Sequence, residues 1–168
     1  MSGKITLIGK TWANTHPLTI VSRAVSEQDA EGLAKLFFMS YDDGSVNSQA
    51  EAREIIQQLF EGEFGSLIPD ASQVISDENG RLIAAILVLE SRRGDGLPQS
   101  PYIFELFTAA SRRREGMAEQ LLRLAIDRLH HGGYEDVALR IDEDNSAALA
   151  LYLTLDFNRW FPDSDDVF

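Results

Sequence analysis

The stretch from residue 102 to residue 123, YIFELFTAASRRREGMAEQLLR, constrains the chain more than any other. Its apolar beginning, Tyr102–Ala109, predicts a strand, and the polar turn Ser111–Glu115 separates it from an amphipathic helix that starts at Gly116. A helix N-terminus has unpaired backbone N–H groups and partial positive charge, and a glycine there lets an anion approach closely. Three arginines, at 112–114, add charge. The stretch therefore predicts a pyrophosphate-binding turn, with a surface turn of solvated arginines as the alternative.

Composition and charge limit the other possibilities. The chain has 168 residues, the size of one domain, and lacks both an apolar run of about 18 residues and a signal peptide. It has no cysteine, and its three histidines form no zinc-ligand spacing, so we expect no disulfide and no metal. The net charge of −12 disfavours nucleic acid and anionic membranes and suits a cationic acceptor such as an amine. We therefore expect a cytoplasmic protein that binds neither nucleic acid nor membranes.

Periodicity and turn residues predict that helices alternate with strands in the second half of the chain only. Residues 1–17 form a short N-terminal extension, either an extra edge strand or loose chain, and 18–168 a single domain. Strands are expected at 18–23, 73–76, 81–90, 102–109, 137–141 and 157–161. Helices are expected at 26–39, 48–61, 116–131 and 146–155, the first two opened by capping boxes. A β-meander in the middle of such an order predicts a mixed sheet.

The arginine turn matches neither common nucleotide-binding loop. The chain contains no G-x-G-x-x-G and no G-x-x-x-x-G-K-[ST], which removes the main support for a Rossmann or P-loop fold. Instead Arg113, Gly116 and Ala118 form R-x-x-G-x-A. This motif resembles the acyl-CoA loop of the GCN5-related N-acetyltransferases (GNAT), whose pattern is Q/R-x-x-G-x-G/A after a strand. Glu105, eight positions before Arg113, has the spacing common in bacterial members.

A second block, NSAALALYLTLDF, strengthens the resemblance. GNAT acetyltransferases carry N-x-x-A-x-x-x-Y-x-x-x-G-F after their fifth strand. The matching positions here are Asn145, Ala148, Tyr152 and Phe157. Asp156 stands where glycine normally ends the helix in a left-handed conformation, and we expect a modest stability cost there because aspartate tolerates this conformation less well. The resemblance covers roughly residues 18–161.

The resemblance implies an α/β fold with a central mixed, largely antiparallel sheet. About six to seven strands, splayed between the fourth and the fifth, would be flanked by about four helices. Because the chain ends soon after Phe157, the seventh strand of many members is expected to be short or missing.

The resemblance also implies an activity. It is acetyl transfer from acetyl-CoA to a primary amine of a small molecule or a protein, by direct attack in a ternary complex. Tyr152 would protonate the departing thiolate, and Glu105 is the best candidate for the base. The residues implied to bind the cofactor are Leu106, Phe107, Thr108, Arg113, Arg114, Glu115, Gly116, Met117, Ala118, Glu119 and Asn145.

Alternatives remain for each role. Tyr152 could be a core tyrosine whose hydroxyl bonds the backbone, and Glu105 could be a strand residue paired with an arginine. The residues after the first expected helix, Tyr41, Asp42 and Asp43, are candidate acceptor contacts. The whole chain could be a catalytically silent acyl-CoA-binding sensor, or an α/β domain whose arginine turn binds nothing. The sequence names no acceptor and leaves a monomer and a homodimer both open.

Overall fold

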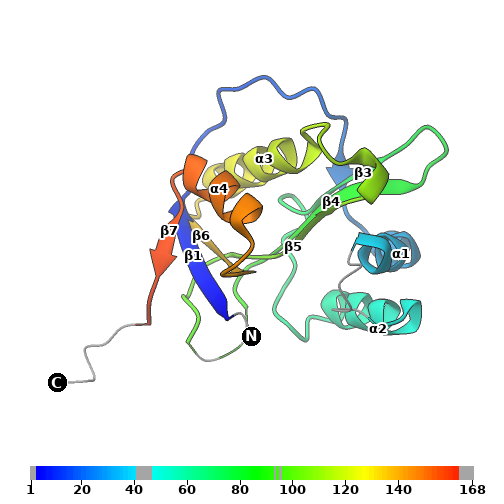
Figure 1. Cartoon of the computed structure of the whole chain (residues 1–168), viewed down its shortest axis with the longest axis horizontal. Helices are drawn as coiled ribbons and strands as arrows, with labels where there is room; N and C mark the ends of the chain where they lie inside the picture. The colour runs from blue at the N-terminus through cyan, green and yellow to red at the C-terminus, as the bar shows by residue number, and fades with distance from the viewer. Residues whose placement is uncertain (1–2, 41–46, 93, 95, 163–168) are drawn as a thin grey trace.

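A seven-stranded sheet forms the centre of the computed structural model, which describes residues 3–40, 47–92, 94 and 96–162 (Figure 1). The strands are β1 Lys4–Lys10, β2 Arg23–Ala24, β3 Gln73–Ser76, β4 Leu82–Leu89, β5 Tyr102–Thr108, β6 Asp136–Asp142 and β7 Asn158–Trp160. They lie in the order β2-β3-β4-β5-β6-β1-β7. Only β5 and β6 run parallel to each other, and every other neighbouring pair is antiparallel. The expected mixed, largely antiparallel sheet is confirmed.

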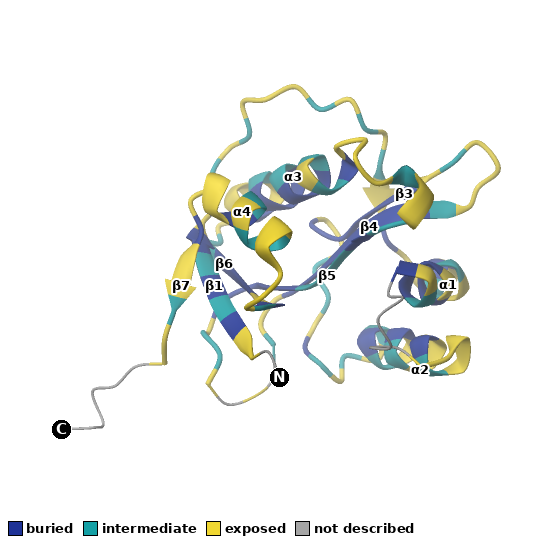
Figure 2. Ribbon diagram, viewed as in Figure 1, coloured by how far each residue is buried: buried dark blue, intermediate teal, exposed yellow. Residues whose placement is uncertain are grey.

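Within the described residues, four α-helices cover the sheet, two on each face. They are α1 Ala30–Ser40, α2 Gln49–Phe60, α3 Met117–His131 and α4 Ser146–Thr154. The central strand β4 is buried on both sides, as the dark blue of Figure 2 shows. Its alternate residues Ala85, Leu87 and Leu89 pack with α1 and α2, whereas Ala84, Ile86 and Val88 pack with α3. The sheet therefore separates two hydrophobic cores, and a ligand passing between two strands would reach both sides.

The N-terminal segment is an interior strand rather than the edge strand or loose chain that the sequence predicts. β1 pairs along its whole length with β6 and, over Thr6–Ile8, with β7. Leu7 is buried, and a side chain at Gly9 would lie 2.9 Å from the ring of Phe157, so only glycine fits. Within the described residues the sheet thus has seven strands, because β1 adds one strand that the sequence does not predict as interior and β7 follows α4.

The predicted strand at 18–23 is wrong, because only Arg23–Ala24 pairs with β3. Residues 11–22 instead cross the outside of α3, as the blue segment of Figure 1 shows. The N–H groups of Thr19 and Ile20 both donate to Gln120 Oε1, at 2.7 and 3.1 Å, so a side chain of α3 replaces the strand partner. Val21 is 86% exposed. The β-branched residues of this segment favour a strand, but the strand does not form.

The predicted capping box at Ser26 is confirmed, whereas the one at Ser48 forms only in part, because Glu51 Oε2 accepts the N–H of Asn47 and not that of Ser48. The Ser26 N–H donates to Asp29 Oδ2 at 2.9 Å, at the start of the short 3-10 turn that leads into α1. Ser48 Oγ accepts the Glu51 N–H at 3.1 Å at the start of α2. The Arg23 guanidinium, 2.6 Å from Asp29, holds the pKa of that carboxyl below its usual value. These contacts fix where α1 and α2 begin, and hence the wall they form over the sheet.

Asp156 has the left-handed conformation that its place in the motif predicts, with φ of 67°. It ends α4, and the next N–H, that of Phe157, donates to the Tyr152 carbonyl at 3.1 Å. This turn buries Phe157 and so fixes the C-terminal end of the helix that carries Tyr152.

The Asp156→Gly variant is expected to be more stable than the wild type by about 0.5–1 kcal/mol, because glycine has no Cβ to strain at positive φ. The urea midpoint should rise while the slope of the transition stays constant. An unchanged or lower midpoint would mean that the Asp156 side chain offsets the strain through contacts of its own.

Candidate active site

The parallel strands β5 and β6 separate almost as soon as they meet. They pair only at Tyr102 and Ala138, where the Ala138 N–H donates to the Pro101 carbonyl at 2.8 Å. Beyond this point a cavity of about 320 Å³ lies between them, which confirms the expected splay. Its described lining consists of Lys4, Phe37, Ile55, Ile103, Phe104, Glu105, Leu106, Leu139, Arg140, Ile141, Asp142, Asn145, Ala148 and Tyr152.

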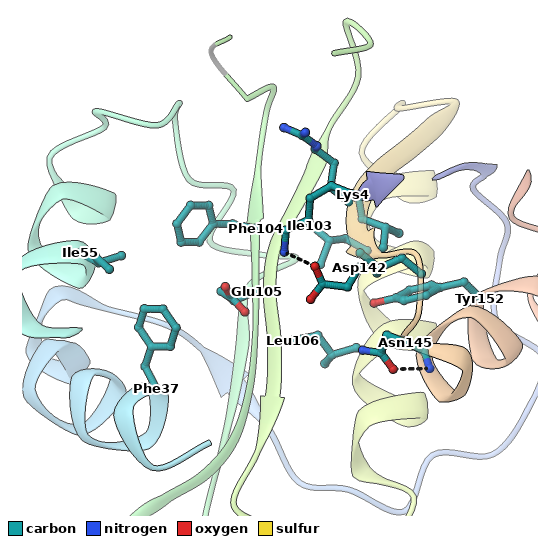
Figure 3. Close-up of a pocket in the computed structure, with 14 residues that line it drawn as sticks. Lys4, Phe37, Ile55, Ile103, Phe104, Glu105, Leu106, Asp142, Asn145 and Tyr152 are labelled. Carbon is teal, nitrogen blue, oxygen red and sulfur yellow. Dashed lines mark hydrogen bonds and ion pairs between the residues drawn. The ribbon is translucent and has the colours of Figure 1, made fainter. Parts of the chain in front are cut away.

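A β-bulge in β5 sets which side chains face each side of this cavity. The register with β4 jumps from Leu87–Glu105 to Val88–Ile103, so Phe104 is an extra residue. In a regular strand, neighbouring side chains point to opposite faces, but a bulge places two consecutive ones on the same face. Figure 3 shows Phe104 and Glu105 on the side of α1 and α2. Glu105 thereby faces the cavity from the opposite side to Tyr152.

Helix α4 contributes Asn145 and Tyr152 to the other wall. Asn145 caps the helix, its Oδ1 accepting the Ala148 N–H at 3.2 Å, which leaves the amide NH₂ to donate elsewhere. Tyr152 is two turns further on, therefore on the same side of the helix, and only 5% exposed. Its ring packs edge-on against Phe157, with centroids 5.3 Å apart, and its hydroxyl points towards the cleft (Figure 3).

The hydroxyl of Tyr152 makes no hydrogen bond within the described residues, so the alternative of a backbone-bonded core tyrosine finds no support there. Burial raises the pKa of this phenol well above its usual value, and the negative charge of Glu105 raises it further. Tyr152 is therefore protonated at neutral pH and can donate a hydrogen bond into the cleft, while the raised pKa makes the phenol a weaker acid than a free tyrosine.

The arginine turn lies at the start of α3. Arg114 and Gly116 both have left-handed backbones, with φ of 73° and 80°, which curl the turn above the helix N-terminus. The α-helical bonds of α3 begin with the Gln120 N–H donating to the Gly116 carbonyl at 3.2 Å. The N–H groups of Met117–Glu119 therefore have no acceptor within the helix and point out of its N-terminal end. A side chain at Gly116 would meet no atom of the described residues within 4 Å, so the turn has open space beside it.

Two of the three arginines of the turn are engaged within the protein. Arg113 Nη2 donates to the Ser40 carbonyl at 2.8 Å, which ties the turn to the end of α1. Arg112 lies 3.2 Å from Glu115 Oε2. Arg114 is exposed and makes no such contact within the described residues. The backbone N–H groups at the start of α3 thus face open space, while Arg113 holds the turn in place.

Most sequence-predicted site residues lie on one continuous path. Glu105, Leu106, Asn145 and Tyr152 line the cavity, and Phe107 and Thr108 continue β5 away from it towards the turn. The six predicted residues from Arg114 to Glu119 form the turn and the first turn of α3. Tyr41, Asp42 and Asp43 lie outside the described residues.

Sequence reasoning missed several lining residues. Lys4 reaches the cavity because β1 is an interior strand, and its Nζ lies 3.2 Å from Asp142 Oδ1. Phe37, Ile55 and Phe104 line the opposite wall. Phe37 and Ile55 lie within helices that the sequence predicts, but no pattern in the sequence places these residues next to the cavity.

The described part of the chain contains neither a metal-binding cluster nor a membrane-spanning helix. Within residues 3–40, 47–92, 94 and 96–162, no group of three His, Asp or Glu side chains is arranged to hold a metal ion. No helix of those residues is both long and apolar enough to cross a membrane.

Comparison with known proteins agrees with this geometry. The model of the acetyltransferase (GNAT) family matches residues 32–157, which include both the arginine turn and the cleft. The chain belongs to the GNAT acetyltransferase family. The mycothiol acetyltransferase of Kocuria rhizophila is 35% identical to this GNAT chain over 71 residues, which are 40% of this chain and 23% of that protein.

Solved GNAT structures share the fold. A GCN5-related N-acetyltransferase from Sphaerobacter thermophilus has a TM-score of 0.67 at 16% identity, covering 94% of this chain and 48% of that one. A GNAT acetyltransferase from Brucella melitensis, solved in complex with acetyl-CoA, has a TM-score of 0.58 at 19% identity and covers 77% and 80%. The present chain thus spans about half the length of the Sphaerobacter protein and under a quarter of the curated relative.

Proposed function

We propose that this GNAT chain is an N-acetyltransferase that moves the acetyl group of acetyl-CoA to a primary amine by direct attack in a ternary complex. The observation that carries the proposal is the placement of Glu105 and the Tyr152 hydroxyl on opposite sides of the gap between β5 and β6 (Figure 3). A base and an acid that face each other across one cavity can serve the two proton transfers of acyl transfer.

The residues present fit the cofactor. From Ile103 onward, the β5 edge that faces β6 has no strand partner among the described residues, so backbone groups of Leu106–Thr108 can bind a pantetheine arm as an added strand would. The N–H groups of residues 114–119 can receive the pyrophosphate at the N-terminus of α3. Asn145 lines the same cavity as Leu106, and its amide NH₂ can donate to the amide groups of the arm.

Acetyl-CoA supplies a thioester, whose acyl carbon bonds to the amine nitrogen while its carbon–sulfur bond breaks. Glu105, directly or through ordered water, takes the proton of an alkylammonium, whose removal at pH 7 costs about 4–5 kcal/mol. Tyr152, which is protonated at neutral pH, gives its proton to the sulfur that leaves, and the phenol is restored by the second proton that the nitrogen loses as the amide forms. Because the two groups flank the cavity from opposite sides, neither transfer blocks the other.

The test is a calorimetric titration with acetyl-CoA, followed by a thiol-release assay with a panel of primary amines. We expect saturable binding, and release of CoA that depends on the amine. Binding without release for any amine would favour the silent acyl-CoA sensor. No binding at all would contradict both functions and leave the arginine turn as a surface feature.

A further inference from the structure

Charged side chains line the cavity on the face of the sheet that α1 and α2 cover. Ala138 of β6 packs with these two helices. Because side chains alternate along a strand, Arg140 and Asp142 point to the same face as Ala138. Lys4 lies directly opposite Asp142 in β1 and shares this face. Three charged lining residues of β1 and β6 therefore lie on the face of the sheet where Glu105 is found (Figure 3).

The bulge in β5 brings Glu105 level with Arg140. Tyr102 of β5 is the residue that pairs with Ala138 of β6. Glu105 lies only two ladder steps beyond Tyr102, because Phe104 is the extra residue of the bulge. Arg140 lies two residues beyond Ala138 in the parallel strand. A carboxylate and a guanidinium are therefore carried at the same level, on the same face, by the two strands that border the cavity.

The guanidinium of Arg140 is available to a ligand. This side chain is exposed and makes no hydrogen bond or ion pair within the described residues. The carboxylate two positions further along β6, that of Asp142, lies 3.2 Å from Lys4 Nζ, as the dashed line of Figure 3 shows. Lys4 thus balances the charge of Asp142. A guanidinium presents a planar set of N–H donors that fits a carboxylate or a phosphate, so Arg140 gives the cavity wall a site for an anion.

The path of the cofactor leaves this face to the acceptor. Asn145, Tyr152 and the turn before α3 belong to the face of the sheet that α3 and α4 cover. A thioester bound by these groups would lie in the gap between β5 and β6, with its sulfur near Tyr152. An amine that attacks the acyl carbon then arrives from the other face, with its nitrogen at Glu105 and Arg140 on the far strand of the gap.

We infer that the acceptor is a primary amine that carries an anionic group, with its nitrogen at Glu105 and its carboxylate or phosphate at Arg140. This inference rests on the proposed function and names the substrate class of the same site. An acceptor with both charges complements both side chains, whereas a simple amine leaves the guanidinium without a partner. The carbon chain between the two groups spans the gap, which is wider than the roughly 4.8 Å between paired strands.

The first arm of the test measures kcat/KM at saturating acetyl-CoA for acceptors that differ in one anionic group. Each ω-amino acid from glycine to 6-aminohexanoate is compared with its own amide, and O-phosphoethanolamine with ethanolamine, so that a carboxylate and a phosphate are tested separately. At the chain length that spans the gap, the anionic acceptor should react at least tenfold faster than its neutral partner. Equal rates in every pair would overturn the inference, while acetyl transfer itself would still support the proposed function.

The second arm uses the Arg140→Gln variant, which removes the charge and keeps a polar side chain at this exposed position. We expect the preference for the anionic acceptor over its neutral partner to fall at least tenfold. Because the same pair of acceptors is compared in both proteins, the different pKa values of their amines cancel. Arg140→Lys keeps the charge and should retain part of the preference.

The matched control is Arg159→Gln, which removes the charge of another exposed strand arginine. Arg159 lies opposite Leu7, whose side chain packs on the α3 side of the sheet, and it does not line the cavity. This variant should keep the wild-type preference. If Arg140→Gln keeps it as well, the anionic group binds elsewhere and the inference is wrong.

The third arm measures binding without turnover, by calorimetric titration of the protein–CoA complex with the same ω-amino acids and with O-phosphoethanolamine. Binding that Arg140→Gln weakens and Arg159→Gln does not, in a protein that transfers no acetyl group, would uphold the site for an anionic amine and refute the proposed catalysis. Absence of both binding and turnover with these anionic amines would refute the inference.

Discussion

The Tyr152→Phe variant is expected to lose acetyl transfer by a factor of about 10²–10⁴ in kcat, the contribution typical of a general acid. Phenylalanine fills the same volume against Phe157, so α4 should keep its place and the protein its stability. The affinity for acetyl-CoA, measured by calorimetry, should stay within about twofold, because the turn and the β5 edge are untouched. A loss confined to kcat would identify Tyr152 as a group that acts in the transition state.

Tyr134→Phe is the matched control, since it removes a hydroxyl beyond the C-terminal end of α3, where Tyr134 does not line the cavity. It should leave both kcat and affinity unchanged. If Tyr152→Phe also keeps the wild-type kcat, Tyr152 is a packing residue, and the leaving thiolate takes its proton from another group. If the wild type itself shows binding but no turnover, the sensor alternative holds and the comparison of the two variants rests on affinity alone.

The elements from β5 to β7 could be predicted to within about two residues because their signals are local. The strand Tyr102–Thr108 is apolar, Gly116 marks the start of α3, and the Asn145 block fixes α4 through a cap and a left-handed end. Each of these signals acts over a few neighbouring residues, so no knowledge of the tertiary structure is needed.

The features that could not be predicted depend on distant partners. Lys4–Lys10 becomes an interior strand only because β6 and β7, more than 120 residues later, lie on either side of it. The 18–23 segment has the composition of a strand, but its N–H groups are taken by Gln120. Tertiary contacts override local propensity in both cases.

The bulge at Phe104 had no signal in the sequence either, since nothing in YIFELFT distinguishes the extra residue. Without it, Phe104 and Glu105 would face opposite sides of the sheet. The position of Glu105 could therefore be predicted from its spacing to Arg113, but not the apolar neighbours that it faces. The motifs locate the residues of the proposed cofactor site, and long-range packing determines which other residues line the cavity.

The Gly116→Trp variant is expected to bind acetyl-CoA at least about a hundredfold more weakly than the wild type. The turn offers its N–H groups beside open space, and an indole at this position would occupy the space that a pyrophosphate needs. Losing two charge-assisted hydrogen bonds of about 1.5–3 kcal/mol each accounts for a loss of this size. Calorimetric titration of the folded variant measures it directly.

Gly133→Trp separates this effect from backbone strain. Gly133 has φ of 89°, close to the 80° of Gly116, and a side chain there also meets no described atom within 4 Å. Both substitutions should therefore destabilise the fold by a similar amount, about 1–2 kcal/mol. Gly133 follows the other end of α3, roughly 20 Å away, so its variant should bind acetyl-CoA as the wild type does. Equal affinity of the two variants would show that the arginine turn binds no phosphate, and that the cofactor, if bound, lies elsewhere.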